Sequence, residues 1–250
     1  MSSASVGWQC PECVHAAATS APAMSARQAL QGSTPIVTYV LIGLNAALFF
    51  AGMALGQLTE RFALYPPLVT DGEWYRLITG GFLHGSVMHL GFNMFALYFL
   101  GVALEPVIGR ARFLAGYAVS LIGGALGVML LWDRSEGYTV GASGAIFGLF
   151  GLLAAFQFSR GINPLRSSIG TILLINLVFT FAVPGISKGG HIGGLLAGAV
   201  VGVAFFVGRD LYSQTPAERS ARFGVVVAIG VVLFWASLAA APSFAELLGG

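Results

Sequence analysis

Long hydrophobic runs separated by short polar connections dominate this chain. Each run is near the ~20 residues that a helix needs to cross a bilayer, although some are shorter. They cover residues 36–56, 84–104, 113–132, 144–159, 168–183, 191–208 and 223–241. The period-2 alternation of a membrane β-barrel is absent. The pattern predicts an all-α polytopic membrane protein with seven spans.

The composition supports a tightly packed helix bundle. Of the 250 residues, 56% are hydrophobic and 9% are charged, whereas an average soluble domain is about 25% charged. The 35 glycines would weaken soluble helices, but in a bilayer small residues let helices approach closely. A net charge of +2 without a basic block or an acidic tail gives no sign of a nucleic-acid partner.

Residues 1–35 form a polar lead rich in Ser, Ala and Gln. They have no continuous apolar stretch, so we interpret them as a flexible cytosolic segment and not as a cleaved signal peptide. Cys10 and Cys13 have CxxC spacing, with only His15 nearby. Because a structural zinc site needs four ligands, a remnant or half-site is favoured over a metal or redox centre, and no metal is expected.

The basic residues are distributed unevenly between the two ends of the spans. Eight share the side of the N-terminus and four lie on the other side: Arg27, Arg110, Arg112, Arg160, Arg166, Arg209, Arg219 and Arg222, against Arg61, Arg76, Arg134 and Lys188. The positive-inside rule then predicts a cytosolic N-terminus and an outer C-terminus. The half-apolar outer connection at 57–83 is either anchored in the interface by its aromatic residues or an ordinary loop.

Polar side chains gather where three spans meet this outer face. Ser143 opens the fourth span, His191 opens the sixth, and His89 and Asn93 lie four residues apart in the second. Such residues are costly in lipid unless they have partners or face water. From Ser143 to Arg160 the helix would measure about 25 Å, shorter than a ~30 Å hydrocarbon core. We therefore expect a wet pocket below the outer surface.

Glycine ladders indicate which helices meet. Gly190, Gly194, Gly198 and Gly202 recur every fourth residue down the sixth span, and Gly144 and Gly148 begin a second ladder down the fourth. This small-xxx-small pattern is typical of close helix contact. If the ladders face each other, Ser143 and His191 meet at their outer ends.

A serine becomes a nucleophile when a base within hydrogen-bond reach takes its proton, and His191 would be that base. No Asp or Glu lies in either span, so the prediction is a dyad and not a triad. The side chains of His89 and Asn93 and the backbone N–H of Ser143 would stabilise an oxyanion. His84 is left as a supporting or loop-anchoring residue. Helix packing and transport remain open alternatives on spacing alone, although charged residues within the spans are almost absent.

Four motifs together resemble the rhomboid family of intramembrane serine proteases, over about residues 36–210. They are WYR at 74–76, HLGFN at 89–93, GASG at 141–144 and HIGG at 191–194. The resemblance implies a six-helix core that cleaves transmembrane proteins in the bilayer near their outer ends, without metal or cofactor. It implies Ser143 as nucleophile, His191 as general base, and His89 and Asn93 as oxyanion-hole side chains.

The resemblance also implies supporting positions: Gly141, Gly144 and Gly194 in the motifs, Arg76 as a loop brace, Glu105 as a structural acid and Phe147 as the aromatic that stacks on the imidazole. Family members often have Tyr at this last position, and WYR departs from a Trp-Arg motif. The implied division is a lead at 1–35, a catalytic core at 36–210, and a linker, extra span and outer tail at 211–250.

Two functions compete within the family. One is an intramembrane endopeptidase of the cell membrane, opening to the extracytoplasmic side, with the fifth span and the bend at Pro184 and Gly185 as its gate. The other is a catalytically silent relative that binds membrane-protein clients, whose usual mark is loss of the Ser or the His. Both residues are present here. The substrate, the oligomeric state and the role of the seventh span stay open.

Overall fold

The computed structural model describes residues 2–3, 8–9, 34–132, 137–208 and 214–242. The chain divides into two units, Met1–Thr34 and Pro35–Gly250. In the first unit, β1 (Ser2–Ser3) pairs antiparallel with β2 (Trp8–Gln9), a small departure from the expected polar lead. Cys10, Cys13 and His15 lie outside the described residues.

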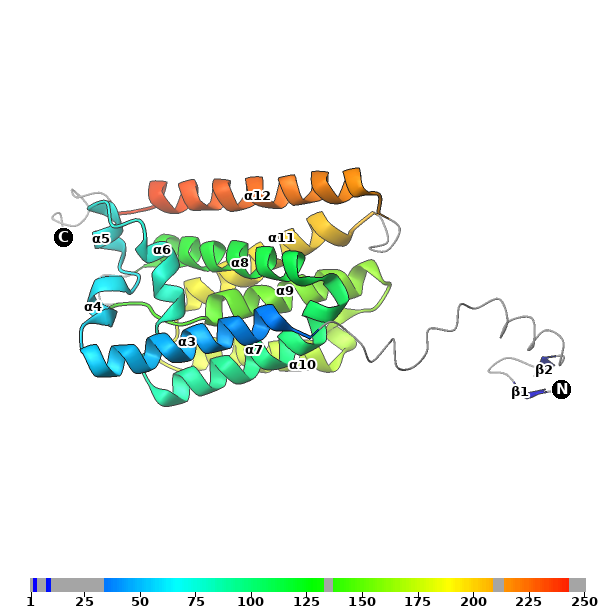
Figure 1. The fold of residues 1–250 in the computed structure, drawn as a ribbon, viewed down its shortest axis with the longest axis horizontal. Coiled ribbons are helices and arrows are strands. Elements are labelled where there is room, and N and C mark those ends of the chain that lie inside the picture. Colours follow the sequence, from blue (N-terminus) through cyan, green and yellow to red (C-terminus); the bar gives the residue numbers. More distant parts are fainter. Residues whose placement is uncertain (1, 4–7, 10–33, 133–136, 209–213, 243–250) are drawn as a thin grey trace. The chain divides into compact units, whose positions relative to one another are not determined.

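The described part of the second unit is a bundle of seven apolar helices (Figure 1). In chain order they are α3 (Ile36–Leu55), α7 (Val87–Ile108), α8 (Arg110–Leu131), α9 (Ser143–Ser159), α10 (Ser168–Ala182), α11 (Lys188–Phe206) and α12 (Pro216–Ala239). Five of them are long and apolar enough to cross a membrane, whereas α9 and α10 are shorter. The chain is a multi-pass membrane protein, as expected, and the all-α class is confirmed for this unit.

Several helices begin at other residues than the predicted hydrophobic runs. The second span begins at Val87 and not at residue 84, so His84 lies before it. The seventh helix begins at Pro216 and not at residue 223, because Thr215 and Glu218 form a capping box at its start. The sixth begins at Lys188, which makes His191 the fourth residue of α11 and not the first.

The connection between α3 and α7 is folded into short helices. They are α4 (Leu58–Phe62), α5 (Pro66–Thr70), α6 (Arg76–Thr79) and the 3-10 turn η1 (Gly80–Phe82). Leu64, Val69 and Leu77 are buried and pack with residues of α8, while Trp74 is half exposed. A second 3-10 turn, η2 (Pro164–Arg166), precedes α10.

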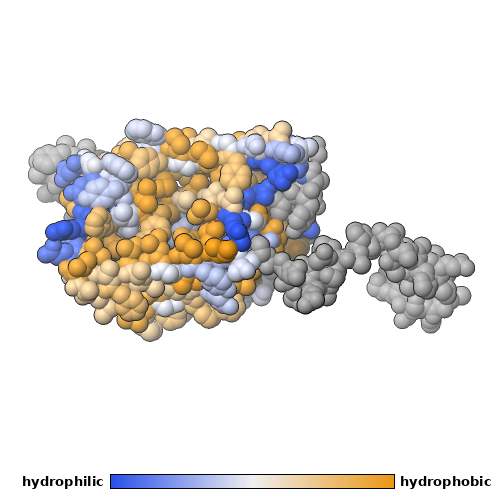
Figure 2. Space-filling model, viewed as in Figure 1, coloured by the Kyte–Doolittle hydropathy of each residue, from blue (hydrophilic) through white to orange (hydrophobic). Residues whose placement is uncertain are grey.

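Hydrophobic side chains cover much of the bundle surface between its ends, and hydrophilic residues gather toward the two ends (Figure 2). The buried core lies mainly among α7, α8, α9 and α11, with Tyr117, Phe113 and Phe205 among its largest fully buried side chains. Side chains that face lipid lie on the surface of the bundle, so many exposed Leu, Val and Phe residues are expected of a membrane protein.

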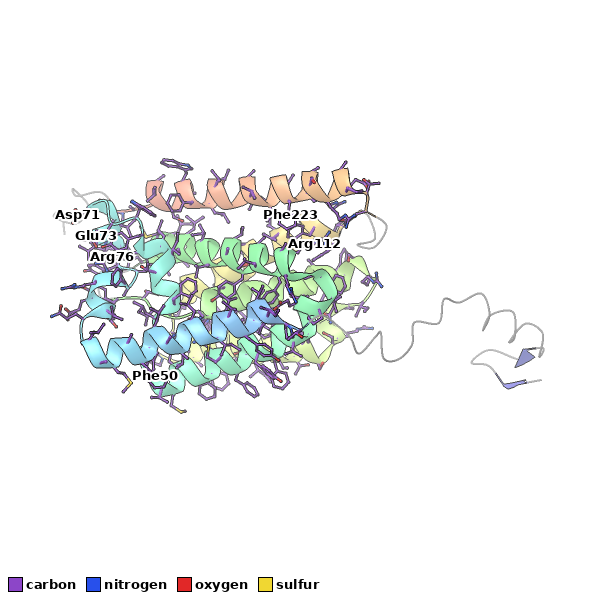
Figure 3. All side chains as sticks on the ribbon, viewed as in Figure 1. Phe50, Asp71, Glu73, Arg76, Arg112 and Phe223 are labelled. Carbon is purple, nitrogen blue, oxygen red and sulfur yellow. The ribbon has the colours of Figure 1, made fainter. Side chains whose placement is uncertain are left out.

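The seventh helix, α12, packs along α8. Val226 is fully buried and Phe223 contacts the ring of Phe205, with centroids 5.2 Å apart. Arg112 lies near Phe223 at this end of the bundle (Figure 3), and its guanidinium contacts the Phe205 ring and the Gln214 side chain. Phe223 thus attaches α12 to α11 through an aromatic contact near the start of the helix, while Arg112 contacts Gln214 just before it.

Candidate active site

Ser143 is the first residue of α9, as the sequence predicts. The preceding Ala142 is fully buried and provides no side-chain cap. The first N–H groups of a helix have no intrahelical acceptor. The N-terminus of α9 therefore combines a serine hydroxyl with backbone N–H donors.

Gly141 brings two candidate site residues to one place. Its φ is +125°, in the region that favours glycine. A β-carbon here would lie 2.7 Å from both Cε1 and Nε2 of His89, and 3.7 Å from Oγ of Ser143. The absence of a side chain at position 141 therefore lets the His89 ring and the Ser143 hydroxyl border the same space.

The segment that leads into Ser143 is held by the connection between α3 and α7. Leu64 and Thr139 exchange two backbone hydrogen bonds of 3.0 and 2.8 Å, and the N–H of Gly141 donates to the carbonyl of Gly80 at 3.0 Å. These bonds join segments about 60 to 75 residues apart. The short helices of residues 57–83 therefore support the site directly.

The predicted glycine contact between α9 and α11 is confirmed. A β-carbon at position 194 would overlap the carbonyl of Gly144, and one at position 198 would overlap the carbonyl of Gly148. A β-carbon on Gly144 would lie 3.1 Å from the carbonyl oxygen of Gly190. We call this contact between the glycines of α9 and α11 the glycine seam. Because Ser143 and His191 are the chain neighbours of Gly144 and Gly190, both lie at the same end of the seam.

A third helix, α8, also packs closely against α11. Sequence analysis did not predict this contact. Gly127 of α8 packs against the backbone of Gly189, and Gly123 against that of Gly193. Helix α11 therefore packs against both α8 and α9, and its backbone lies close to the backbones of both helices. The repeated glycines near residues 123–127 were the available signal.

His191 is buried, with two side chains fixing its ring. The ring of Phe147 stacks on it, with centroids 4.0 Å apart and planes inclined by 16°. The hydroxyl of Thr180, in α10, lies 2.7 Å from Nδ1. The stacking fits the role predicted for Phe147. Thr180 was missed, although a polar residue in an apolar span was the kind of signal that identified the other site residues.

His89 and Asn93 lie one turn apart near the start of α7. Ser86 caps this helix by accepting from the backbone N–H of His89 at 3.1 Å, and the amide of Asn93 donates to the carbonyl of His89 at 3.0 Å. That bond uses one of the two N–H groups of the Asn93 amide. Asn93 is buried and His89 is half-buried, and the contact at Gly141 brings His89 beside Ser143.

His84 lies behind this pair, in the connection before α7. Its ring packs edge-on against the ring of His89, with centroids 5.0 Å apart. Both ring nitrogens are buried without a hydrogen-bond partner among the described residues. Burial, with a smaller contribution from the nearby His89, lowers the pKa of His84 to about 4.

Arg76 braces the connection between α3 and α7. Its Nε donates to the carboxylate of Glu73 at 2.6 Å, and its Nη1 donates to the carbonyl of Ala63 at 2.8 Å. Figure 3 shows Arg76, Glu73 and Asp71 grouped at one end of the bundle. Hydrogen bonds from Tyr75 and then from Arg76 lower the pKa of the Glu73 carboxyl.

Glu105 lies near the end of α7, whereas His89 and Asn93 lie near its start. Its fully buried carboxylate accepts from the backbone N–H groups of Val37 and Thr38, at 3.0 and 2.8 Å, and from the Thr38 hydroxyl at 2.7 Å. Helix α3 has no side-chain cap of its own. Glu105 of α7 therefore caps α3 from another helix, with its negative charge at the positive end of the helix dipole.

The described part of the chain contains no cluster of three His, Cys, Asp or Glu side chains that could hold a metal ion. The arrangement instead combines a hydroxyl, a stacked imidazole and several N–H donors. This set of groups suits nucleophilic acyl transfer.

Comparison with known proteins matches residues 71–208 to the Rhomboid domain. Rhomboid protease GluP of Bacillus subtilis (strain 168) is 39% identical over 178 residues, which are 67% of this chain and 34% of that protein. RHOMBOID-like protein 5 of Arabidopsis thaliana is 35% identical over 156 residues, 60% of this chain and 50% of that protein.

A third relative has a length closer to the matched region. Putative rhomboid protease YdcA of Bacillus subtilis (strain 168) is 37% identical over 171 residues, 66% of this chain and 85% of that protein. The chain thus spans about a third of GluP and half of RHOMBOID-like protein 5, but most of YdcA. With the domain match covering more than half of its length, this chain belongs to the rhomboid family.

Proposed function

We propose that this protein is an intramembrane serine endopeptidase that cleaves transmembrane helices through a dyad of Ser143 and His191. The observation that carries the proposal is the glycine seam, in which Gly144 of α9 meets Gly190 and Gly194 of α11. Only glycine permits such close backbone approach, and the two reactive side chains flank the contact. The names of the relatives GluP and YdcA, both of which include "rhomboid protease", agree with this class.

The reaction follows from the roles of these groups. Oγ of Ser143 attacks the scissile carbonyl while Nε2 of His191 takes its proton. The imidazolium then protonates the leaving amine, and an acyl-enzyme remains. Water, deprotonated by His191, hydrolyses the ester and restores the serine. The ring of Phe147 keeps the imidazole plane in position throughout.

The negative charge that develops on the carbonyl oxygen needs donors placed in advance. We assign this role to the His89 ring, to the free N–H of the Asn93 amide and to the backbone N–H of Ser143. The shared space beside Gly141 supports the assignment of His89. The alanine variants of His89 and Asn93 are expected to lose about 10²- to 10³-fold in kcat.

Substrates are proposed to reach the site past α10. This helix exposes Leu174, Val178 and Phe181, and after it Pro184 and Gly185 form a bend in which Gly185 has a φ of +82°. A scissile segment must be extended to meet Ser143, so helices with Gly or Ala near the outer face should be preferred. Equal cleavage of stable poly-Leu helices would contradict this preference.

The proposed orientation puts the N-terminus in the cytosol, in the cell membrane, with the site opening to the extracytoplasmic side. In a chain whose Cys10 and Cys13 are replaced by Ser, Asp71→Cys should react with an impermeant maleimide in intact cells, and Asn163→Cys should not. The reverse pattern would show the opposite insertion.

The proposed division is a lead at 1–35, a six-helix catalytic core at 36–210 and an accessory helix within 211–250. A chain lacking residues 1–34 should then keep its activity without added metal. Loss of activity in that variant, with folding intact, would assign the lead a role in catalysis.

The deciding experiment is labelling of the detergent-solubilised protein with a fluorophosphonate probe. Wild type should form an adduct that Ser143→Ala abolishes, while Ser159→Ala at the far end of α9 should label normally. Cleavage of a transmembrane substrate should fall by about 10⁴-fold or more in Ser143→Ala and in His191→Ala. A folded wild type without a Ser143-dependent adduct would instead favour a client-binding protein.

A further inference from the structure

The hydroxyl of Thr180 makes two hydrogen bonds. It lies 2.7 Å from Nδ1 of His191, and it is 2.8 Å from the backbone carbonyl oxygen of Asn176. Thr180 is fully buried, so this contact is shielded from bulk water. Thr180 is in α10, whereas His191 is in α11.

Only one assignment of protons satisfies both contacts. A threonine hydroxyl has a single hydrogen, and a carbonyl oxygen can only accept. The hydroxyl hydrogen of Thr180 is therefore donated to Asn176, and its oxygen accepts the N–H of Nδ1. The neutral imidazole of His191 then carries its proton on Nδ1 and leaves an unprotonated lone pair on Nε2.

The opposite assignment would disable the base. If the hydroxyl hydrogen were donated to Nδ1, the bond to Asn176 would be lost and Nε2 would carry the proton. A protonated Nε2 cannot accept the proton of Ser143. The bond between Thr180 and Asn176 thus decides which nitrogen of His191 is basic.

We propose that Thr180 is a positioning residue that holds His191 in the tautomer and orientation needed by a general base, an inference that rests on the function proposed above. Stacking on Phe147 sets the plane of the imidazole, but a stacked ring can still rotate within its plane. The bond at Nδ1 fixes that rotation and directs Nε2 to the opposite side. Thr180 takes the place that an acidic residue has in a triad.

The backbone of α10 selects the side-chain conformation that this role needs. In a helix the Thr side chain divides between two rotamers, one of which lets Oγ1 bond the carbonyl four residues earlier. The bond to Asn176 is of this kind. It orients the hydroxyl before any proton transfer occurs, so little ordering remains when His191 becomes charged.

A hydroxyl stabilises the imidazolium less than a carboxylate would. Loss of a carboxylate with the wrong tautomer costs about 10⁴-fold in serine proteases, whereas loss of one neutral hydrogen bond costs about tenfold, or ~1.4 kcal/mol. Thr180→Val removes the hydroxyl and preserves the shape. We expect it to lower kcat about tenfold with little change in KM.

Two further variants separate positioning from packing. Thr180→Ser restores a hydroxyl and should recover most of kcat. Thr171→Val removes an exposed hydroxyl of α10 whose hydrogen bond to the carbonyl of Ser167 is 3.5 Å long. The activity of this variant should match wild type. Failure of Thr180→Ser to recover more activity than Thr180→Val would overturn the positioning role.

Nitrogen-15 NMR of histidine-labelled protein reads the tautomer directly, because protonated and unprotonated ring nitrogens have well-separated shifts. The His191 signals are identified by their loss in His191→Gln. Wild type should show protonated Nδ1 and unprotonated Nε2, and Thr180→Val should show a mixture. An unchanged tautomer in Thr180→Val, or an Nε2-protonated wild type, would refute the inference. Neither reading depends on whether Ser143 forms an adduct, so failure of the proposed function is recognised separately.

Discussion

The ring of Phe147 lies almost parallel to the ring of His191, with centroids 4.0 Å apart. Phe147 comes from α9, one turn after Ser143, so the proposed nucleophile and the ring that supports its proposed base belong to the same helix. The relative position of the two side chains therefore depends on one helical turn and one ring contact, in addition to the glycine contact between α9 and α11.

Replacing Phe147 by Leu should lower kcat about tenfold, because the imidazole loses a contact worth about 0.5 to 1.5 kcal/mol beyond its buried area. Phe147→Tyr should retain activity, since it keeps the ring. Phe150→Leu is the matched control, a buried aromatic of the same helix in the core. Equal loss of kcat in the two Leu variants would show that bulk and not stacking matters.

The seam between α9 and α11 should not tolerate even a methyl group at its tightest point. A β-carbon at position 198 would overlap three backbone atoms of Gly148. Gly198→Ala should lower the free energy of unfolding by about 1 to 3 kcal/mol through overpacking, and should lower activity by moving His191 away from Ser143.

Gly224 of α12 is the control for this prediction, because a β-carbon there has nothing within 4 Å. Gly224→Ala should be neutral or slightly stabilising, since Ala is the better helix former by up to about 1 kcal/mol. Thermal unfolding in detergent and probe labelling measure both effects. Similar behaviour of the two Ala variants would contradict the close approach of the helices.

Removal of the Glu105 carboxylate should destabilise the bundle without altering the chemistry. Glu105→Ala leaves the N–H groups of Val37 and Thr38 unpaired inside the protein, at a cost of about 3 kcal/mol. Thr38→Val removes one of the three bonds and should cost about 1 kcal/mol. Activity of the folded fraction, measured by probe labelling per folded molecule, should be unchanged in both.

Acidification should weaken the fold through His84. Its folded pKa of about 4 lies below the ordinary 6.5, so the fold favours the neutral ring. This contribution is complete above pH 6.5 and is lost as the pH falls toward 4. At pH 5 the loss should be about 2 kcal/mol.

The apparent Tm in detergent, measured at pH 7.5 and pH 5, tests this prediction. His84→Gln should unfold with a smaller difference between the two pH values, because Gln does not titrate. A difference as large as in wild type would assign the acid sensitivity to other groups.

Local pattern predicted much of this molecule. Run length identified the seven helices, polar residues at span ends pointed to Ser143 and His191, and the ladders through Gly144 and Gly194 indicated that their helices meet. These features repeat with helical period and are therefore visible in one dimension. The catalytic roles themselves remain proposals, supported by the geometry described above.

What escaped prediction depends on contacts between distant segments. A structural role for Glu105 was expected from the resemblance, but its partner Thr38 was not, because the two lie 67 residues apart and no local pattern links them. Thr180 acquires its meaning only when α10 is placed beside α11. The short helices α4, α5 and α6 have five residues or fewer, too few for a hydrophobic period to develop.

Helix α10 differs from its neighbours in having lipid-facing side chains over most of its length. Gly170 and Thr180 are its buried residues, and Ile169 and Leu173 are partly buried against the core. A single helix thus separates the acyl chains of the bilayer from Nδ1 of His191. Under the proposed mechanism, the thickness and fluidity of the surrounding lipid would act on the opposite face of the helix that orients the general base, and the membrane itself would be part of the catalytic environment.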